Sequence, residues 1–310
     1  MNKDASIFVA GHRGLAGSAI TRELQKHGYQ NLRQRTHEEL DLTVQAEVTD
    51  FFATERPDYV FLAAAMVGGI LANDTYPADF IGINLQIQTN IIDAAYRSGT
   101  KKLCFLGSSC IYPKQAAQPM SEESLLTGPL ETTNQWYAIA KIAGIKMCQA
   151  YRKQHGFNAI SVMPTNLYGP GDNFDLDTSH VLPALIHKFD DARRSGAANV
   201  TLWGSGTPRR EFLYVDDLAE AVCFLMKNYD SPEIINVGVS KDIPIAELAD
   251  LVRDVVGFDG GIEFDANKPD GTARKLLDVT KLSELGWHAS TSLEGGIRKT
   301  YQWYLENVAP

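Results

Sequence analysis

A glycine-rich turn near the N-terminus limits the choice of fold more than any other part of this sequence. Residues 11–17 read GHRGLAG, a G-x-x-G-x-x-G spacing that follows an apolar run at 6–10 and opens an amphipathic pattern at 15–28. Glycines between a strand and a helix allow a tight turn and a close approach of the backbone to a pyrophosphate, which the helix N-terminus also attracts. The alternative is a turn without a ligand, and the spacing differs from the G-x-G-x-x-G of many dehydrogenases. The turn predicts a dinucleotide-binding unit at the start of the chain.

Short apolar runs alternate with helical patterns through the first half of the chain. We expect helices at 79–99 and 134–156, and strands at 59–65, 102–109 and 158–167. Apolar strands that alternate with helices are typical of a parallel sheet covered on both faces. The predicted fold class is α/β, a Rossmann-type doubly wound parallel sheet with a smaller mixed α/β C-terminal lobe for the substrate. Residues 1–169 would form the dinucleotide-binding domain and residues 170–310 mainly the substrate lobe, with chain crossings back to the first.

Composition excludes several classes of protein. The 310 residues are 44% hydrophobic and carry a formal net charge of −9, which argues against nucleic acid as a partner. No run of 18 apolar residues and no basic, then apolar, N-terminal segment is present, so we expect neither a membrane span nor a signal peptide. The four cysteines lack CxxC or zinc-finger spacing. We therefore expect a reduced, cytoplasmic protein without a metal site.

Cations near the end of the second expected strand bear on the choice of cofactor. An acidic residue at this place favours a free ribose 2′-hydroxyl, whereas arginine favours a 2′-phosphate. Arg33 and Arg35 lie in the stretch NLRQRTHEELDL, and Arg13 lies inside the glycine turn. These three cations favour NADP(H), and a solvated charged loop is the alternative. Asp41 and Leu42 would then meet the adenine edge.

A tyrosine and a lysine share one face of the expected helix at 134–156. Tyr137 and Lys141 stand four residues apart in YAIAK, and Ser108 ends an expected strand about thirty residues upstream. A nearby ammonium lowers the pKa of a phenol, which can then exchange a proton with a carbonyl or alcohol oxygen near neutral pH. Ser108 would form a hydrogen bond with the reacting oxygen. For Ser109 two interpretations stay open, a contact with the cofactor or a cap at the end of the strand. The set predicts a reductase site.

With these residues in view, the chain resembles the extended short-chain dehydrogenases/reductases, the superfamily of sugar-nucleotide epimerases and dehydratases. Within it, the chain is similar to the GDP-L-fucose synthase family of bifunctional 3,5-epimerase/4-reductases. The resemblance covers nearly the whole chain and runs through GHRGLAGSAI, AAAMVGGILAN, TYPADFI, LGSSCIYPK, YAIAKIAGIKMC, SVMPTNLYGPGDNF, SHVLPALI, WGSGTPRREFLYVDD and KPDGTARKLLDVTKL.

The resemblance implies three operations on a GDP-4-keto sugar. The protons at C3 and C5 are acidic because both carbons flank the ketone, and NADPH then reduces the ketone at C4. By resemblance, Ser108, Tyr137 and Lys141 are the oxyanion stabiliser and proton donor at C4, and Cys110 and His180 are the acid/base pair of epimerisation. From the residues alone, Cys110 would be a small buried hydrophobe and His180 a polar residue that opens a helix.

The resemblance also implies which residues bind the cofactor and the substrate. The implied NADP(H) contacts, with the ribose residues named above, are Gly11, His12, Arg13, Gly14, Leu15, Ala16, Gly17, Arg35, Asp41, Leu42, Leu106, Gly107, Ser108, Ser109, Lys141, Pro164, Thr165, Asn166, Leu167 and His180. The implied contacts of the GDP-4-keto sugar are Lys188, Trp203, Arg210 and Asp270. Cationic side chains suit a diphosphate, and an indole offers an apolar wall. A solvated face for Lys188 and a core position for Trp203 are the alternatives.

One departure and two alternatives accompany this resemblance. His37 stands where the family carries an arginine that grips the 2′-phosphate, so the margin of NADP over NAD is smaller unless Arg35 and Arg13 compensate. A paralogue acting on a related GDP-4-keto sugar, such as a colitose synthase or a heptose epimerase/reductase, would keep the same catalytic residues. A non-catalytic, NADP-sensing protein is a more remote alternative.

The helices at 79–99 and 134–156 are apolar on more than one face, and the family pairs through such helices, so we expect a homodimer.

Overall fold

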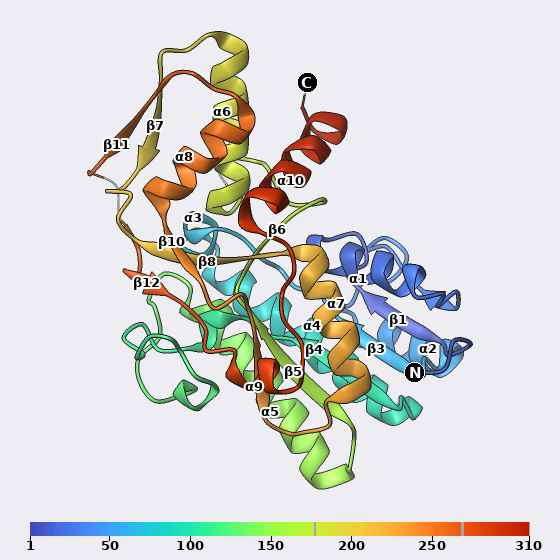
Figure 1. The fold of residues 1–310 in the computed structure, drawn as a ribbon. Coiled ribbons are helices and arrows are strands. Elements are labelled where there is room, and N and C mark those ends of the chain that lie inside the picture. The colour runs from blue at the N-terminus through green and yellow to red at the C-terminus, as the bar shows by residue number, and fades with distance from the viewer. Residues whose placement is uncertain (177, 268–269, 310) are drawn as a thin grey trace.

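A six-stranded parallel sheet forms the centre of the larger lobe in the computed structural model, which describes residues 1–176, 178–267 and 270–309 (Figure 1). Lys268 and Pro269, which begin the last quoted motif, lie outside the described residues. In the order β2-β1-β3-β4-β5-β9, the strands are Leu32–Arg33, Ile7–Ala10, Tyr59–Leu62, Lys102–Leu106, Ala159–Pro164 and Ile234–Val237. Neighbouring strands all pair in parallel. The predicted fold class is confirmed.

Helices cover both faces of this sheet, which is why its strands are mainly apolar, with Lys102, Ser161 and Asn236 as buried polar exceptions. On one face lie α1 (Leu15–Lys26) and α7 (Val215–Asn228), which pack on each other. On the other face lie α2 (Gln45–Glu55), α4 (Pro77–Ser98) and α5 (Gln135–His155). Every residue of β1, β4, β5 and β9 is buried. Both faces of such a strand are buried, so its residues do not alternate between apolar and polar.

In the part of the chain that the structure describes, the smaller lobe contains two short sheets and three helices. Its first sheet joins β10 (Asp242–Pro244), β8 (Arg209–Tyr214) and β12 (Arg274–Lys275), with β6 (Asn166–Tyr168) also paired to β8. Its second sheet joins β7 (Asn199–Trp203) and β11 (Gly261–Asp265). A separate apolar core lies among α6 (Val181–Ser195), α8 (Ile245–Val256) and α10 (Leu293–Asn307). The remaining helices are α3 (Ile70–Thr75), α9 (Thr280–Glu284) and two 3-10 turns, η1 (Ser109–Ile111) and η2 (Glu122–Ser124).

The chain passes between the lobes more than once. Both α7 and β9 come after residue 170 in sequence, yet they complete the larger lobe's sheet and one of its helical layers. The division at residue 169 stays a prediction. Three expected strands are shorter than predicted: β3 ends at Leu62 and not at residue 65, β4 ends at Leu106, where the chain turns into η1, and the run at 158–167 divides into β5 and β6. Among the described residues, no helix is long and apolar enough to cross a membrane.

Candidate active site

The glycine turn after β1 forms a cradle that admits no side chains at two points. Gly11 has a φ of 83°, and a Cβ atom there would lie 2.8 Å from the backbone of Ala64. A Cβ atom on Gly17 would lie 2.1 Å from the carbonyl oxygen of Gly11. The turn therefore brings α1 against the end of β1 as closely as the backbones allow. This is the packing that a pyrophosphate-binding turn requires.

The N-terminus of α1 fits the anionic group of a dinucleotide. Its N-cap is Gly14, which has no side chain to cap the first-turn amides of Leu15, Ala16 and Gly17. Amides without a side-chain cap at a helix N-terminus attract phosphate oxygens. His12 stays neutral to a lower pH than usual because burial, followed by the Arg13 guanidinium, lowers its pKa. The residues of the turn thus fit a dinucleotide cofactor.

The cations after β2 are less available than the sequence indicates. Arg35 and Arg33 both pair with the carboxylate of Glu55 on α2, at 2.5 Å and 3.1 Å. Arg13 is exposed. His37 is 81% exposed and lies 3.9 Å from Asp41, whose carboxylate accepts hydrogen bonds from Thr43. The carbonyl oxygen of Leu42 accepts the side-chain amide of Asn90, so this segment is held against α4. Of the three arginines that the sequence indicates for the 2′-phosphate, Arg33 and Arg35 pair with Glu55 and Arg13 does not.

The expected cofactor residues at the ends of β4 and β5 lie side by side, because these strands are neighbours in a parallel sheet. Residues 106–109 leave β4, and residues 164–167 leave β5 and enter β6. Ser109 is buried, whereas the hydroxyl of Ser108 caps η1 by accepting the amide of Cys110 at 3.2 Å. Asn166 donates to the carbonyl oxygen of Glu211. Carboxyl ends of adjacent parallel strands are the usual place of a ligand in this architecture.

The Ser–Tyr–Lys set is assembled from β4 and α5. Lys141 is buried and donates from Nζ to the carbonyl oxygen of Leu106 at 2.8 Å, and its ammonium lies 5.7 Å from the centre of the Tyr137 ring. Burial lowers the pKa of Lys141 to about 8. Contrary to the expected effect of Lys141, the pKa of Tyr137 is raised, because burial and the nearby Cys110 outweigh a hydrogen bond with Ser108. The three side chains are together, with Tyr137 held in its protonated, donating form.

Cys110 differs from the other three cysteines. Cys104, Cys148 and Cys223 are buried in the cores, and burial raises the pKa of the Cys148 and Cys223 thiols to about 12. Cys110 is half-buried on η1, next to Tyr137. It is therefore the cysteine of this chain that is open to a ligand at the carboxyl edge of the sheet.

Two residues that the sequence reasoning missed flank the Cys110 sulfur. The side-chain amide of Asn134 donates to Sγ at 3.3 Å, and the Lys275 ammonium lies 4.0 Å from it. The sulfur therefore has an amide donor and an ammonium group as polar neighbours. Asn134 precedes α5 directly and had a local signal, its place three residues before Tyr137. Lys275 had no such local signal, because only the pairing of β12 with β8 brings it near Cys110.

His180 enters the site from the other lobe, as the N-cap of α6. Part of its side chain is exposed, yet the surrounding protein, followed by the Lys275 ammonium, lowers the pKa of His180. Lys275 therefore acts electrostatically on His180 and contacts Cys110. The structure brings both members of the expected acid/base pair into the neighbourhood of one cation.

The four expected substrate residues form two pairs in the smaller lobe. Lys188 on α6 lies 5.9 Å from the ring centre of Trp203, which is 57% exposed at the end of β7. Burial lowers the pKa of Lys188. Burial lowers the pKa of Arg210 on β8, and the nearby Cys110 and Asp270 oppose that effect. Asp270 accepts hydrogen bonds from the amide and hydroxyl of Ser205. Arg210 therefore lies near both Asp270 and Cys110. Trp203 is exposed and is not a core tryptophan.

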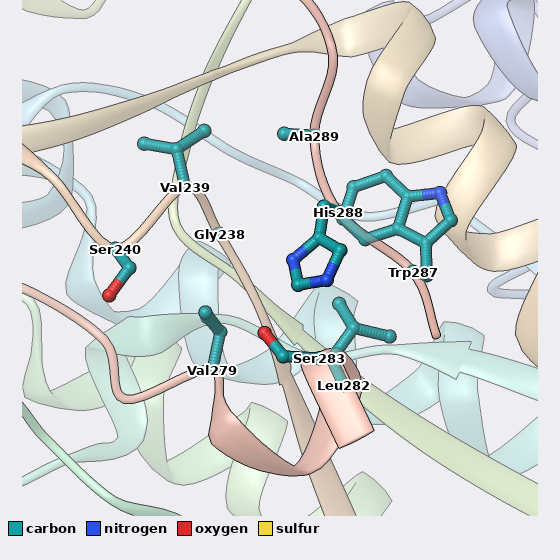
Figure 2. Close-up of a pocket in the computed structure, with 9 residues that line it drawn as sticks. All are labelled: Gly238, Val239, Ser240, Val279, Leu282, Ser283, Trp287, His288 and Ala289. Carbon is teal, nitrogen blue, oxygen red and sulfur yellow. The ribbon is translucent and has the colours of Figure 1, made fainter. Parts of the chain in front are cut away.

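Two hollows on the surface lie outside the catalytic set. The first, about 220 Å³, is lined by nine residues that come from the segment after β9, from α9 and from the chain after α9 (Figure 2). The second, about 300 Å³, lies between residues 114–118 and 271–274, beside the strand that carries Lys275. None of the expected catalytic residues lines either hollow. Among the described residues, no group of three His, Cys, Asp or Glu side chains could hold a metal ion.

A dinucleotide cradle with serine, tyrosine and lysine at the carboxyl edge of a parallel sheet defines a short-chain dehydrogenase/reductase. Residues 7–238 match the NAD dependent epimerase/dehydratase family. The chain is 64% identical over 308 residues to a putative GDP-L-fucose synthase 2 of Arabidopsis thaliana, covering 99% of this chain and 94% of the relative. It is 56% identical to the GDP-L-fucose synthase of Escherichia coli, covering 97% of each. The chain therefore belongs to the epimerase/dehydratase family and, within it, to the GDP-L-fucose synthases.

Solved structures agree with this assignment. A GDP-L-fucose synthetase from Naegleria fowleri bound to NADP is 32% identical, with a TM-score of 0.91 over 99% of this chain and 96% of that one. A GDP-6-OMe-4-keto-L-xylo-heptose reductase from C. jejuni is 38% identical, with a TM-score of 0.95 over 99% of each chain. The shared fold thus occurs in proteins named for different GDP-sugars, and the chain is an enzyme of the epimerase/reductase type.

Proposed function

We propose that this enzyme converts GDP-4-keto-6-deoxy-D-mannose to GDP-L-fucose, as a 3,5-epimerase and NADPH-dependent 4-reductase. The observation that carries the proposal is the placement of Cys110, next to Tyr137 and 4.0 Å from the Lys275 ammonium. Hydride transfer alone has no use for a thiol beside its proton donor. A second acid/base group there suits proton exchange at the carbons next to the ketone. The names of the relatives support the same substrate.

NADPH fits the cradle between β1 and α1 and supplies the hydride for C4 when bound. The first-turn amides of α1 would hold its pyrophosphate, and Arg13 with Arg35 would hold the 2′-phosphate. Lys141 would hold the ribose of the nicotinamide, as expected from the resemblance. The NADP-bound relative supports NADP over NAD.

Reduction at C4 requires a proton on the oxygen that was the ketone. Tyr137 is suited to give it, because burial keeps the phenol protonated until a strong base develops. Ser108 would hold the same oxygen, and the Lys141 ammonium would stabilise the phenolate that remains.

Epimerisation requires a base and an acid on opposite faces of the sugar ring. Cys110 comes from the larger lobe and His180 from the smaller one, so the two approach the ring from different elements. The enolate that forms when C3 or C5 loses its proton carries its charge on the C4 oxygen. Ser108 and Tyr137 would stabilise that charge, so one oxyanion site would serve both chemistries. Which of Cys110 and His180 removes each proton stays open.

The proposal is tested by identifying the product by NMR after incubation with GDP-4-keto-6-deoxy-mannose and NADPH in deuterated water. Deuterium at both C3 and C5 of GDP-L-fucose is the expected result. Deuterium at C5 alone would indicate the colitose-synthase alternative, in which C3 is not epimerised. Turnover of a heptose substrate but not of the 6-deoxy sugar would indicate a heptose epimerase/reductase. No turnover of any GDP-4-keto sugar would favour the non-catalytic alternative.

We further propose that the enzyme is a cytoplasmic homodimer that binds neither nucleic acid nor membrane. The helices α4 and α5 pack on each other, and α5 also carries the exposed Trp136 and Ile139, at 39% and 38% exposure. Helices with a second apolar face suit a two-fold interface. Gel filtration is expected to give about twice the mass of one 34.1 kDa chain. A single chain's mass would contradict the dimer.

A further inference from the structure

The motif AAAMVGGILAN is not used by the reductase or by the acid/base pair, yet the structure holds it firmly. Its turn at Met66–Gly69 connects β3 to α3. The buried side chain of Asn84 on α4 accepts the Met66 amide at 2.9 Å and donates to the Met66 carbonyl oxygen at 3.0 Å. The buried Asn73 donates to the carbonyl oxygens of Gly68 and Gly69 at 2.8 Å and 3.0 Å. Two buried asparagines thus hold the backbone of this turn in place, and the contacts of the turn indicate its role.

The turn touches the segment that carries His180. The Gly69 amide donates to the carbonyl oxygen of Thr178 at 3.0 Å, a bond between residues more than a hundred positions apart. The next two residues are Ser179 and His180, and His180 begins α6. Figure 1 shows α3 at the end of α6 where the two lobes meet. This bond therefore connects the larger lobe to the chain just before the imidazole.

No side chain fits at Gly69. A Cβ atom there would lie 2.7 Å from the carbonyl oxygen of Ser179, although the φ of −65° is open to any residue. Glycine is required by the approach of Ser179, not by the backbone angle. Any larger residue would push Ser179, and with it His180, away from the larger lobe.

The same turn reaches the reductase residues on its other side. A Cβ atom on Gly68 would lie 3.2 Å from the ring of Phe80, and that ring packs edge-on against Tyr137 with 6.4 Å between ring centres. The turn therefore lies between a neighbour of Tyr137 and the segment of His180.

We propose that the Gly68–Gly69 turn is a positioning element, in which the Gly69 amide and the absence of a side chain at Gly69 set the place of His180 relative to the sugar ring. This proposal rests on the proposed function for the role of His180 in epimerisation. A displacement of an acid/base group by about 1 Å is enough to cost up to about a hundredfold in rate. Gly69 acts through His180 and touches no reacting atom.

A double-mutant cycle tests the proposal. Gly69→Ala is expected to lower the rate of deuterium incorporation into GDP-4-keto-6-deoxy-mannose at least about tenfold, while NADPH affinity and the KM of the sugar change little. In a His180→Gln background the same substitution is expected to add almost nothing, because its effect passes through the imidazole. Gly128→Ala is the matched control, since its added Cβ would meet Pro113 at an ordinary 3.4 Å. An equal loss in both backgrounds, or no loss in either, would overturn the proposal.

A second variant and a second readout keep the test decisive. If Gly69→Ala does not fold, Asn73→Ala removes the bonds to the Gly68 and Gly69 carbonyls without a clash, and is carried through the same cycle. The ring resonances of His180 in 15N-histidine-labelled protein, identified by their absence in His180→Gln, are expected to move in either variant. Unmoved His180 resonances defeat the positioning role whether or not the enzyme turns over. A parent enzyme without deuterium incorporation defeats only the proposed function.

Discussion

The ammonium of Lys275 lies 4.0 Å from the sulfur of Cys110, and the same ammonium contributes to the lowered pKa of His180. One cation from β12 therefore acts on both residues that we expect to move protons at C3 and C5. A positive charge favours the neutral imidazole, which is the basic form of His180. The same cation thus lies beside the thiol from the larger lobe and acts on the imidazole from the smaller lobe.

Cys110→Ser is expected to separate the two chemistries. Serine keeps the size of the side chain but is a far weaker acid and base near neutral pH, so deuterium incorporation next to the ketone should fall by at least about a hundredfold. NADPH affinity should stay within twofold, roughly, because Cys110 is not among the expected cofactor contacts. Cys223→Ala on α7 is the control, since that cysteine is buried in the opposite helical layer. Unchanged epimer formation in Cys110→Ser would remove the thiol from the mechanism.

Lys275→Met is expected to change the pH profile of deuterium incorporation. In the parent the pKa of His180 is lowered, so the imidazole stays neutral to a pH below its ordinary 6.5. Without the ammonium, the imidazolium is disfavoured less and the pKa of His180 rises. The limb of the profile that reports His180 should therefore move to higher pH. A limb that does not move, followed at several pH values between about 5 and 8, would show that Lys275 has no electrostatic influence on the reaction.

Much of this site could be predicted from the sequence, because much of it is local. The glycine turn lies between one strand and one helix, and Tyr137 and Lys141 are one helical turn apart. Lys275 could not be predicted, since its place depends on the register of β12 on β8, where it stands opposite Arg210. The engagement of Arg35 by Glu55 depends in the same way on where α2 packs. The pKa of Tyr137 was wrongly expected to fall, because sequence spacing gives the distance to Lys141 but not the burial.

Arg13→Ala is expected to weaken the preference for NADPH. Arg33 and Arg35 already share Glu55, so Arg13 is the cation best able to meet a 2′-phosphate. Loss of one charged hydrogen bond should lower kcat/KM for NADPH about tenfold or more, and leave kcat/KM for NADH nearly unchanged. Arg22→Ala on α1, the helix that follows the turn of Arg13, is the control, because Arg22 pairs with Asp216. A parent enzyme that prefers NADH would contradict the NADP assignment itself.

Lys102→Met is expected to destabilise the larger lobe far more than the adjacent Lys101→Met. The buried Lys102 donates from Nζ to three carbonyl oxygens at the end of α7, those of Leu225, Met226 and Tyr229, at 3.3, 2.9 and 2.6 Å. The Leu225 carbonyl oxygen also accepts the Tyr229 amide, but carbonyls at the C-terminal end of a helix generally lack helical partners, and methionine cannot satisfy them. The free energy of unfolding should fall by about 2 kcal/mol or more, and the thermal midpoint by about 4–8 °C.

Lys101 provides the matched comparison because it is 64% exposed and its pair with Asp58, at 2.8 Å, lies at the surface. Water and salt screen such a pair, so Lys101→Met should leave the thermal midpoint nearly unchanged. Equal midpoints for the two variants, measured by circular dichroism in the same buffer, would mean that the end of α7 does not depend on Lys102. A lower midpoint for Lys102→Met alone would establish that a buried ammonium from β4 closes the helix that lies over the neighbouring strands.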